Sequence, residues 1–148
     1  MNVDLIDANH IDSKYLFEDD SLSFNYNKSK IVVIGNNPIG FYTTHSIFGR
    51  LTLEYNLFKY KRNQGLGGTF VNIVTELVGK ECTEYDKIYL LISSKNKKSE
   101  KVAKKNNYDL SNDYEFWNLI NEEMPEYSVY EKNNEFSKKN CKRRLLNK

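Results

Sequence analysis

The sequence contains little proline or cysteine and no long apolar run. Its 148 residues include two prolines, two cysteines and one tryptophan. Cys82 and Cys141 lack the spacing of a metal site, and no export signal precedes them. We therefore expect free cytosolic thiols, not a disulfide scaffold or a zinc finger. No stretch approaches the roughly 20 apolar residues of a membrane helix, and the N-terminus lacks the basic-then-apolar form of a signal peptide. These absences predict a cytoplasmic protein that does not contact the membrane.

Charges of the two signs nearly balance. Lys and Arg number 22 and Asp and Glu number 20, a formal net charge of +2, which does not suggest a protein that wraps a polyanion. With 39% hydrophobic residues the chain is too apolar to be disordered. We expect a single domain over residues 1–137. Residues 138–148 are strongly basic, which predicts a frayed tail; attraction to RNA is the functional alternative.

Hydrophobic periodicity predicts the order of strands and helices. Residues 51–58 alternate between apolar and polar with a period of two, as in a strand. Gly35-Asn36-Asn37-Pro38 is typical of a turn and predicts a hairpin between the strands on either side. The predicted strands are residues 3–6, 30–34, 39–48, 51–58, 87–92 and 127–130. The predicted helices are residues 7–17, a segment from the glycines at 65–68 to Gly79, residues 97–105 after the N-cap Asn96, and a helix that opens with a capping box at Asn112 and Glu115 and runs through Glu123.

These elements predict an α/β (α+β) fold. Its sheet is mixed and mostly antiparallel, with helices packed against it. Residues 51–92 form its one β-α-β unit.

The most informative segment is the junction between the strand at 51–58 and the following helix, Arg62-Asn63-Gln64-Gly65-Leu66-Gly67-Gly68-Thr69. Gly65 and Gly67 allow positive φ and let a ligand approach the backbone closely. The first N–H groups of a helix have no intrahelical partner, and they carry the positive end of the helix dipole. Such a junction is suited to binding phosphate.

Two common phosphate motifs do not fit this chain. The dinucleotide fingerprint G-x-G-x-x-G fails because Phe70 stands where the third glycine is required. Gly35 and Gly40 have the glycine spacing of a P-loop, but Phe41 replaces its lysine.

The junction instead resembles that of the GCN5-related N-acetyltransferase (GNAT) family. The family's hallmark, Q/R-x-x-G-x-G/A between the fourth strand and the third helix, is met by Arg62-x-x-Gly65-x-Gly67. Asn96 lies where an asparagine commonly begins the next stretch, and Asn107-Tyr108 stands for the usual Gly-Phe pair. The resemblance covers residues 30–108. It implies a GNAT-type sheet, splayed between its fourth and fifth strands, that binds acetyl-CoA (coenzyme A).

The resemblance also implies which residues hold that cofactor. Backbone groups near Leu57 would pair with the pantetheine arm, and N–H groups of the glycine junction would hold the pyrophosphate. Asn96 and its neighbours would lie beside the far end of the arm. The cofactor-binding residues expected on this basis are Leu57, Phe58, Arg62, Asn63, Gln64, Gly65, Leu66, Gly67, Gly68, Thr69, Asn96 and Ser99.

For catalysis, Glu54 resembles the position of a glutamate base, and the N–H near Leu57 resembles the usual oxyanion donor. The tyrosine that is the family's common acid falls at Ala103, which has no hydroxyl. Either Tyr108 or solvent would then protonate the thiolate. A solvated strand residue explains Glu54 at least as well, and a polar strand position is the favoured interpretation of His45.

We therefore expect an N-acetyltransferase that transfers the acetyl group of acetyl-CoA to a primary amine by direct attack in a ternary complex. One alternative is a catalytically weakened acyl-CoA-binding or regulatory module. Another is a toxin that acts on aminoacyl-tRNA, which makes nucleic acid a less favoured partner. The identity of the amine stays open, and a homodimer that completes the acceptor pocket fits the short segment before residue 31.

Overall fold

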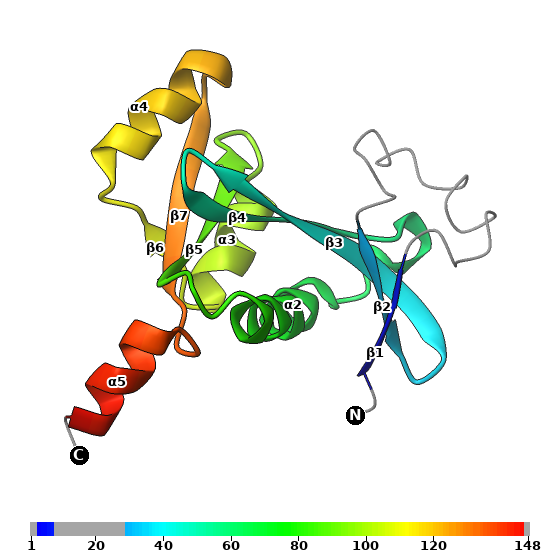
Figure 1. The fold of residues 1–148 in the computed structure, drawn as a ribbon. Coiled ribbons are helices and arrows are strands. Elements are labelled where there is room, and N and C mark those ends of the chain that lie inside the picture. The colour runs from blue at the N-terminus through cyan, green and yellow to red at the C-terminus, as the bar shows by residue number, and fades with distance from the viewer. Residues whose placement is uncertain (1–2, 8–28, 147–148) are drawn as a thin grey trace.

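The computed structural model describes residues 3–7 and 29–146. Within them the chain forms a seven-stranded sheet in the order β1-β2-β3-β4-β5-β7-β6 (Figure 1). The strands are β1 (Val3–Asp7), β2 (Lys30–Ile34), β3 (Asn37–Ile47), β4 (Arg50–Leu57), β5 (Lys87–Ser93), β6 (Asp109–Leu110) and β7 (Tyr127–Asn133). The helices are α2 (Gly67–Glu81), α3 (Lys97–Lys105), α4 (Tyr114–Glu123) and α5 (Lys138–Leu146), with a 3₁₀ turn at Lys59–Lys61.

The predicted strands are confirmed, whereas the two-residue strand β6 was not foreseen. The helix expected at 7–17 lies outside the described residues, except for Asp7, which ends β1. None of the described helices is both long and apolar enough to span a membrane.

The β2–β3 hairpin turns more tightly than expected. Gly35 and Asn36 both have positive φ, 54° and 67°, as a two-residue turn between antiparallel strands requires. Pro38, predicted as part of the turn, already lies in β3 opposite Val33. The register shifts between Val32 and Val33, and proline is tolerated in a strand at such an irregularity.

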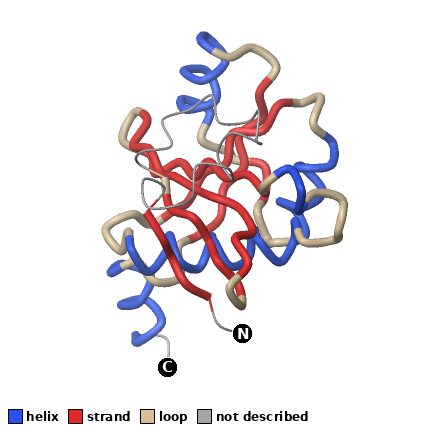
Figure 2. Tube along the Cα trace, turned by 90° about the vertical axis from the view of Figure 1, so that its right-hand side faces the viewer, coloured by secondary structure: helices blue, strands red, loops and turns tan. Residues whose placement is uncertain are grey.

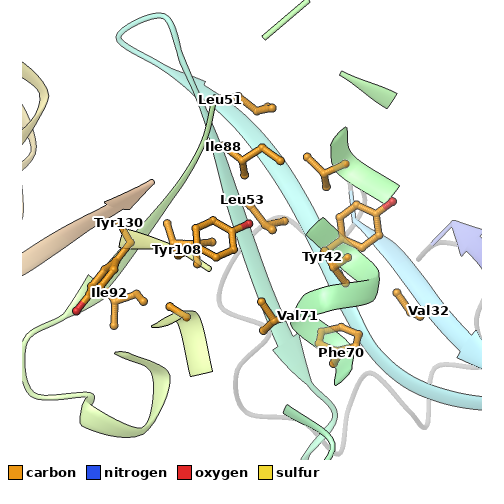
Figure 3. Close-up of a cluster of buried hydrophobic side chains, with 14 of the residues drawn as sticks. Val32, Tyr42, Leu51, Leu53, Phe70, Val71, Ile88, Ile92, Tyr108 and Tyr130 are labelled. Atoms are coloured by element: carbon orange, nitrogen blue, oxygen red, sulfur yellow. The ribbon is translucent and has the colours of Figure 1, made fainter. Parts of the chain in front are cut away.

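Helices cover both faces of the sheet (Figures 1 and 2). Successive residues of β5 point to opposite faces, so Leu90 packs in the cluster that includes α2 and α3, while Tyr89 packs against α4. Figure 3 shows the larger cluster, in which Phe70 and Val71 of α2 lie near Leu53 and Tyr42 of the sheet. This core fixes α2 across the strands at the centre of the molecule.

The β-α-β unit predicted at residues 51–92 is confirmed as β4-α2-β5. Its two strands are parallel, but they pair only at Thr52 and Tyr89. By contrast, β5 pairs with β7 along its whole length, from Lys87 to Ser93. The sheet is therefore splayed between its fourth and fifth strands, as the resemblance implies.

Helix α4 begins one residue later than predicted. Its N-cap is Asp113, whose Oδ1 accepts a hydrogen bond from the Phe116 N–H at 3.2 Å, so the capping box expected at Asn112 is wrong. The same carboxylate accepts two hydrogen bonds from Arg50 of β4, both at 3.1 Å, and one from the Tyr89 hydroxyl. These long-range partners favour Asp113 over Asn112 as the cap and tie α4 to the sheet.

Most of the segment expected to be a frayed tail is helical, and its last two residues lie outside the described ones. Residues 138–146 form α5, which projects from one end of the sheet (Figure 1). The Ser137 hydroxyl accepts from the Asn140 N–H at 3.0 Å, and the Lys138 N–H donates to the Thr83 carbonyl. The Asn140 side-chain amide donates to the carbonyls of Asp86 and Asn134. These contacts hold the first turn of α5 despite its basic composition.

Protonation of the Asp113 carboxylate should lower the free energy of unfolding at acid pH. Burial raises this pKa, but the hydrogen bonds from Arg50 and the Phe116 N–H, with the Arg50 charge, outweigh burial and lower it. A depressed folded-state pKa stabilises the protein above the unfolded value, near 4, and this contribution is lost as pH falls through the folded value. Asp113→Asn keeps a capping side chain but removes the charge. We expect it to lower the free energy of unfolding by about 1 kcal/mol at pH 7.

Urea denaturation from pH 7 to pH 2 measures this effect. The difference between wild type and Asp113→Asn should shrink toward zero below pH 4, whereas the exposed control Asp109→Asn should show little difference at any pH. A constant difference across the range would contradict the assigned role of the carboxylate charge.

Candidate functional site

A cleft opens where β4 and β5 diverge. It has a volume of about 1140 Å³. One wall is formed by residues 54–57 of β4, and the opposite wall by residues 90–93 of β5. The start of α2 and the first turns of α3 close one end, and Met124 and Tyr127 also line the cleft.

The N-terminus of α2 faces this cleft without a side-chain cap. Leu66 occupies the N-cap position and makes no side-chain cap hydrogen bond, and the first turn contains no acidic residue. Residues 65–69 all line the cleft. Because the first N–H groups of a helix lack intrahelical partners, this end of α2 presents donors and positive potential to the cleft.

Only one of the three glycines at this junction is required by the fold itself. Gly65 has φ 72°, a conformation that favours glycine. Gly67 and Gly68 do not have positive φ. A Cβ would meet nothing closer than Val102 at 3.8 Å at Gly67, and nothing within 4 Å at Gly68. Their lack of a side chain leaves the cleft side of the helix start open to a ligand.

Two hydrogen bonds hold the loop that leads into α2. The Arg62 Nε donates to the Leu57 carbonyl at 3.2 Å, which ties the loop to the end of β4. Lys98 of α3 donates from Nζ to the Asn63 Oδ1 at 3.0 Å and so bridges the loop to α3. Asn63 has φ 61°, which asparagine tolerates better than most residues.

The end of β4 offers a backbone donor to the cleft. The Phe58 N–H donates to the Ile39 carbonyl of β3 at 2.9 Å. Because alternate residues of a strand direct their N–H groups to opposite edges, the N–H of Leu57 points to the other edge, where β5 has diverged. An extended ligand in the gap can therefore hydrogen-bond to β4 as an added strand does.

Charge is distributed unevenly along the cleft. Arg62, Lys98 and Lys105 line the end near the two helices, and Glu54 is the only carboxylate among the described lining residues. Asn96 caps α3, because its Oδ1 accepts from the Ser99 N–H at 3.1 Å, and both residues line the cleft. The helix end of the cleft is thus suited to an anion.

The far end of the cleft carries groups that can transfer protons. His45 Nε2 and Glu54 Oε2 are 3.0 Å apart. Tyr55 and Tyr127 also line the cavity, but toward its helix end: the Tyr55 ring lies 6.2 Å from the Phe70 ring of α2, and Tyr127 pairs with Ser93 at the end of β5. Burial raises the pKa of Tyr55 to about 12, so its hydroxyl stays protonated at neutral pH.

Comparison with solved structures identifies the architecture. An acetyltransferase of the GNAT family from Bacillus anthracis matches with TM-score 0.55 and 18% identity over 73% of this chain and 67% of that one. The N-acetyltransferase PseH of Campylobacter jejuni matches with TM-score 0.62 and 12% identity, over 88% of this chain and 97% of that one. The aminoglycoside acetyltransferase AAC(6')-Ib was solved with coenzyme A and kanamycin. It matches with TM-score 0.63 and 12% identity, over 95% of this chain and 96% of that one. The chain has the GNAT fold.

The sequence alone matches no family model and no curated protein. The GNAT fold therefore rests on structural likeness, and it agrees with the resemblance carried by the glycine motif. The splayed strands, the uncapped helix and the glycine junction meet at one place in this fold.

Three residues expected in the GNAT site lie elsewhere. Phe58 is fully buried, in a separate core cluster with Phe41. The Gln64 side chain turns back to donate to the Tyr60 carbonyl at 2.8 Å, and Gln64 does not line the cleft. Tyr108 is fully buried, with its hydroxyl 2.7 Å from the Thr75 Oγ1. Tyr108 does not line the cleft, so its hydroxyl cannot reach a thiolate there, and the acid role expected for it does not fit the structure.

The remaining expected residues do line the cleft. They are Glu54, Leu57, Arg62, Asn63, Gly65, Leu66, Gly67, Gly68, Thr69, Asn96 and Ser99. Ala103 is completely buried in the main core cluster. Sequence reasoning missed Tyr55, although its place on β4, beside Glu54, was a usable signal.

Proposed function

We propose that the chain is an acetyl-CoA-dependent N-acetyltransferase that acetylates a primary amine by direct attack in a ternary complex. The observation that carries this proposal is the uncapped, glycine-rich start of α2 facing a cleft between two parallel strands that pair at one position only. A long ligand with a phosphate-bearing end and an extended arm suits such a cleft. Coenzyme A has this form and is bound in several solved structures of the same fold.

Different residues of the cleft would bind different parts of coenzyme A. The N–H groups at the start of α2 would hold the pyrophosphate, with Arg62 and Lys98 adding positive charge nearby. The N–H of Leu57 would hydrogen-bond to the arm or to the thioester oxygen. Acetyl-CoA supplies an activated acetyl group. The chain would position this cofactor, polarise the thioester oxygen and protonate the departing thiolate.

We further propose that Tyr55 provides the proton that the departing thiolate requires. It lines the cleft two residues before Leu57 on β4, and its hydroxyl stays protonated at neutral pH. This role replaces the one expected for Tyr108 and compensates for the missing hydroxyl at Ala103.

The pyrophosphate site can be tested with a substitution that separates binding from folding. Gly68→Glu places a negative side chain in open space in the first turn of α2. Acidic residues near a helix N-terminus stabilise the helix by about 0.3–1 kcal/mol, so the melting temperature should stay equal or rise. Repulsion of the pyrophosphate should nevertheless weaken acetyl-CoA binding at least about tenfold, measured by isothermal titration calorimetry.

Two controls accompany this measurement. Gly68→Ala should bind acetyl-CoA nearly as wild type does, and Asn72→Glu adds the same charge to an exposed position farther along α2. Equal affinities of wild type and Gly68→Glu would contradict the proposed phosphate site, as would equal losses in Gly68→Glu and Asn72→Glu.

The role of Tyr55 is tested by removing one hydroxyl. Tyr55→Phe should lower kcat by about 100-fold, because a positioned acid contributes about 10²–10⁴-fold. The affinity for acetyl-CoA should change little. Release of free thiol in the presence of an amine measures the rate. Tyr108→Phe is the matched control, and an equal loss in the two variants would contradict the assignment.

A second candidate function is an acyl-CoA-binding module with little chemistry. The buried Ala103, where the family's tyrosine acid is expected, favours this alternative. The two functions are separated by a screen of amine acceptors. Kanamycin and spermine are sensible first members, because solved structures of similar fold contain them. Acetyl-CoA binding without acceptor-dependent thiol release in a broad screen would support the binding module.

A further inference from the structure

We propose that His45 and Glu54 form one proton-accepting pair, in which the His45 imidazole takes the proton from the attacking amine and Glu54 orients and stabilises that imidazole. This inference rests on the proposed acetyl transfer, and it makes Glu54 a positioning residue, not the base itself.

The pair is built on neighbouring strands. In the antiparallel register of β3 and β4, His45 lies opposite Thr52 and Thr43 lies opposite Glu54. Residues opposite each other share a face of the sheet, so His45 and Glu54 are diagonal neighbours on one face. The Thr52 hydroxyl donates to the His45 carbonyl at 3.0 Å and anchors this part of β3.

Both side chains are open to a substrate. His45 and Glu54 line the cleft between β4 and β5, and their side chains are 48% and 46% exposed. An amine that approaches a thioester held in the gap can therefore reach the imidazole.

The hydrogen bond determines which imidazole nitrogen can accept a proton. An ionised carboxylate can only accept hydrogen bonds, so the 3.0 Å contact requires a proton on His45 Nε2. In the neutral imidazole, Nδ1 then carries the free lone pair. No described residue hydrogen-bonds to Nδ1. Glu54 thus holds the tautomer whose basic nitrogen is unoccupied.

The proton transfer balances with the acetyl transfer. The amine nitrogen forms a bond to the acetyl carbon, and the bond from that carbon to sulfur breaks. The amine proton moves to His45 Nδ1, and the Glu54 carboxylate stabilises the resulting imidazolium. The thiolate takes its proton from Tyr55, and exchange with water restores both side chains.

Other charged and titratable groups from several elements line the same cleft. Tyr127 of β7 lines the same cleft, as does the uncharged Met124, the residue that follows α4. Tyr55 is on β4, while Arg62, Lys98 and Lys105 lie toward the helix end of the cleft. Glu54 is the group bonded directly to the imidazole. An imidazole also titrates nearer to neutral pH than a carboxylate, which suits it better to accept an amine proton there.

The test compares pH–rate profiles of kcat/KM for the amine in wild type, His45→Ala and Glu54→Gln. The wild-type rate should rise with pH through the range where imidazoles titrate, about pH 6–7. His45→Ala should lower the rate about 100-fold at pH 7 and lose this rise. Added imidazole should restore part of the activity, while acetyl-CoA affinity stays unchanged.

Glu54→Gln distinguishes the His45–Glu54 pair from a mechanism in which Glu54 alone is the base. Glu54→Gln leaves the imidazole in place, so the rate should fall but its rise with pH should persist. If Glu54 is itself the base, Glu54→Gln removes the rise of kcat/KM with pH and His45→Ala leaves that rise in place. This result overturns the inference. His10→Ala, which removes the chain's other histidine, is the control and should keep the wild-type profile.

Nitrogen NMR of the wild-type imidazole provides a readout independent of activity. A neutral His45 with its proton on Nε2 is the expected result, and a proton on Nδ1 instead would overturn the pair. A wild type that binds no acetyl-CoA refutes the proposed function and, with it, this inference. An active wild type matched by His45→Ala refutes the inference alone.

Discussion

The structure depends on two neighbouring parallel strands that pair at one position only. β4 and β5 pair at Thr52 and Tyr89 and then separate. The helix that joins them, α2, must begin at the carboxyl end of β4, on the side where the strands have diverged. Ligands of α/β sheets bind where neighbouring strands part beyond their carboxyl ends. The same constraint therefore creates the cleft, exposes the edge of β4 and places a helix N-terminus beside both.

The cleft is chemically different at its two ends. At the helix end, the uncapped start of α2 and the cations Arg62 and Lys98 line the same part of the cleft. At the other end, His45 Nε2 and Glu54 Oε2 are 3.0 Å apart. An anionic group and an amine therefore suit opposite ends of one cavity.

Local sequence patterns predicted the elements that local physics determines. The period-two strand at 51–58, the helix that begins at the glycines and the cap at Asn96 are confirmed. Where two neighbouring residues could both cap a helix, contacts with residues distant in the sequence determine which one does. Asn112 and Asp113 can both cap α4, and the bonds from Arg50 and Tyr89 select Asp113. Likewise, contacts with Thr83 and Asp86 order a basic segment that looked unstructured.

The site was predictable where it depends on the backbone and less so where it depends on side-chain direction. The glycine junction could be located from spacing alone. Spacing could not reveal that Tyr108 faces Thr75 in the core, or that Phe58 packs against Phe41. The contact between His45 and Glu54 needs the register of two strands, which no local pattern supplies.

The central claim is that the start of α2 binds the pyrophosphate of coenzyme A beside the gap between β4 and β5. A crystal structure of the chain with coenzyme A tests it most directly. The account predicts pyrophosphate oxygens within hydrogen-bond distance of the N–H groups of residues 67–69, and the pantetheine arm between the two strands. A pyrophosphate bound away from α2, or an arm outside the gap, would contradict it.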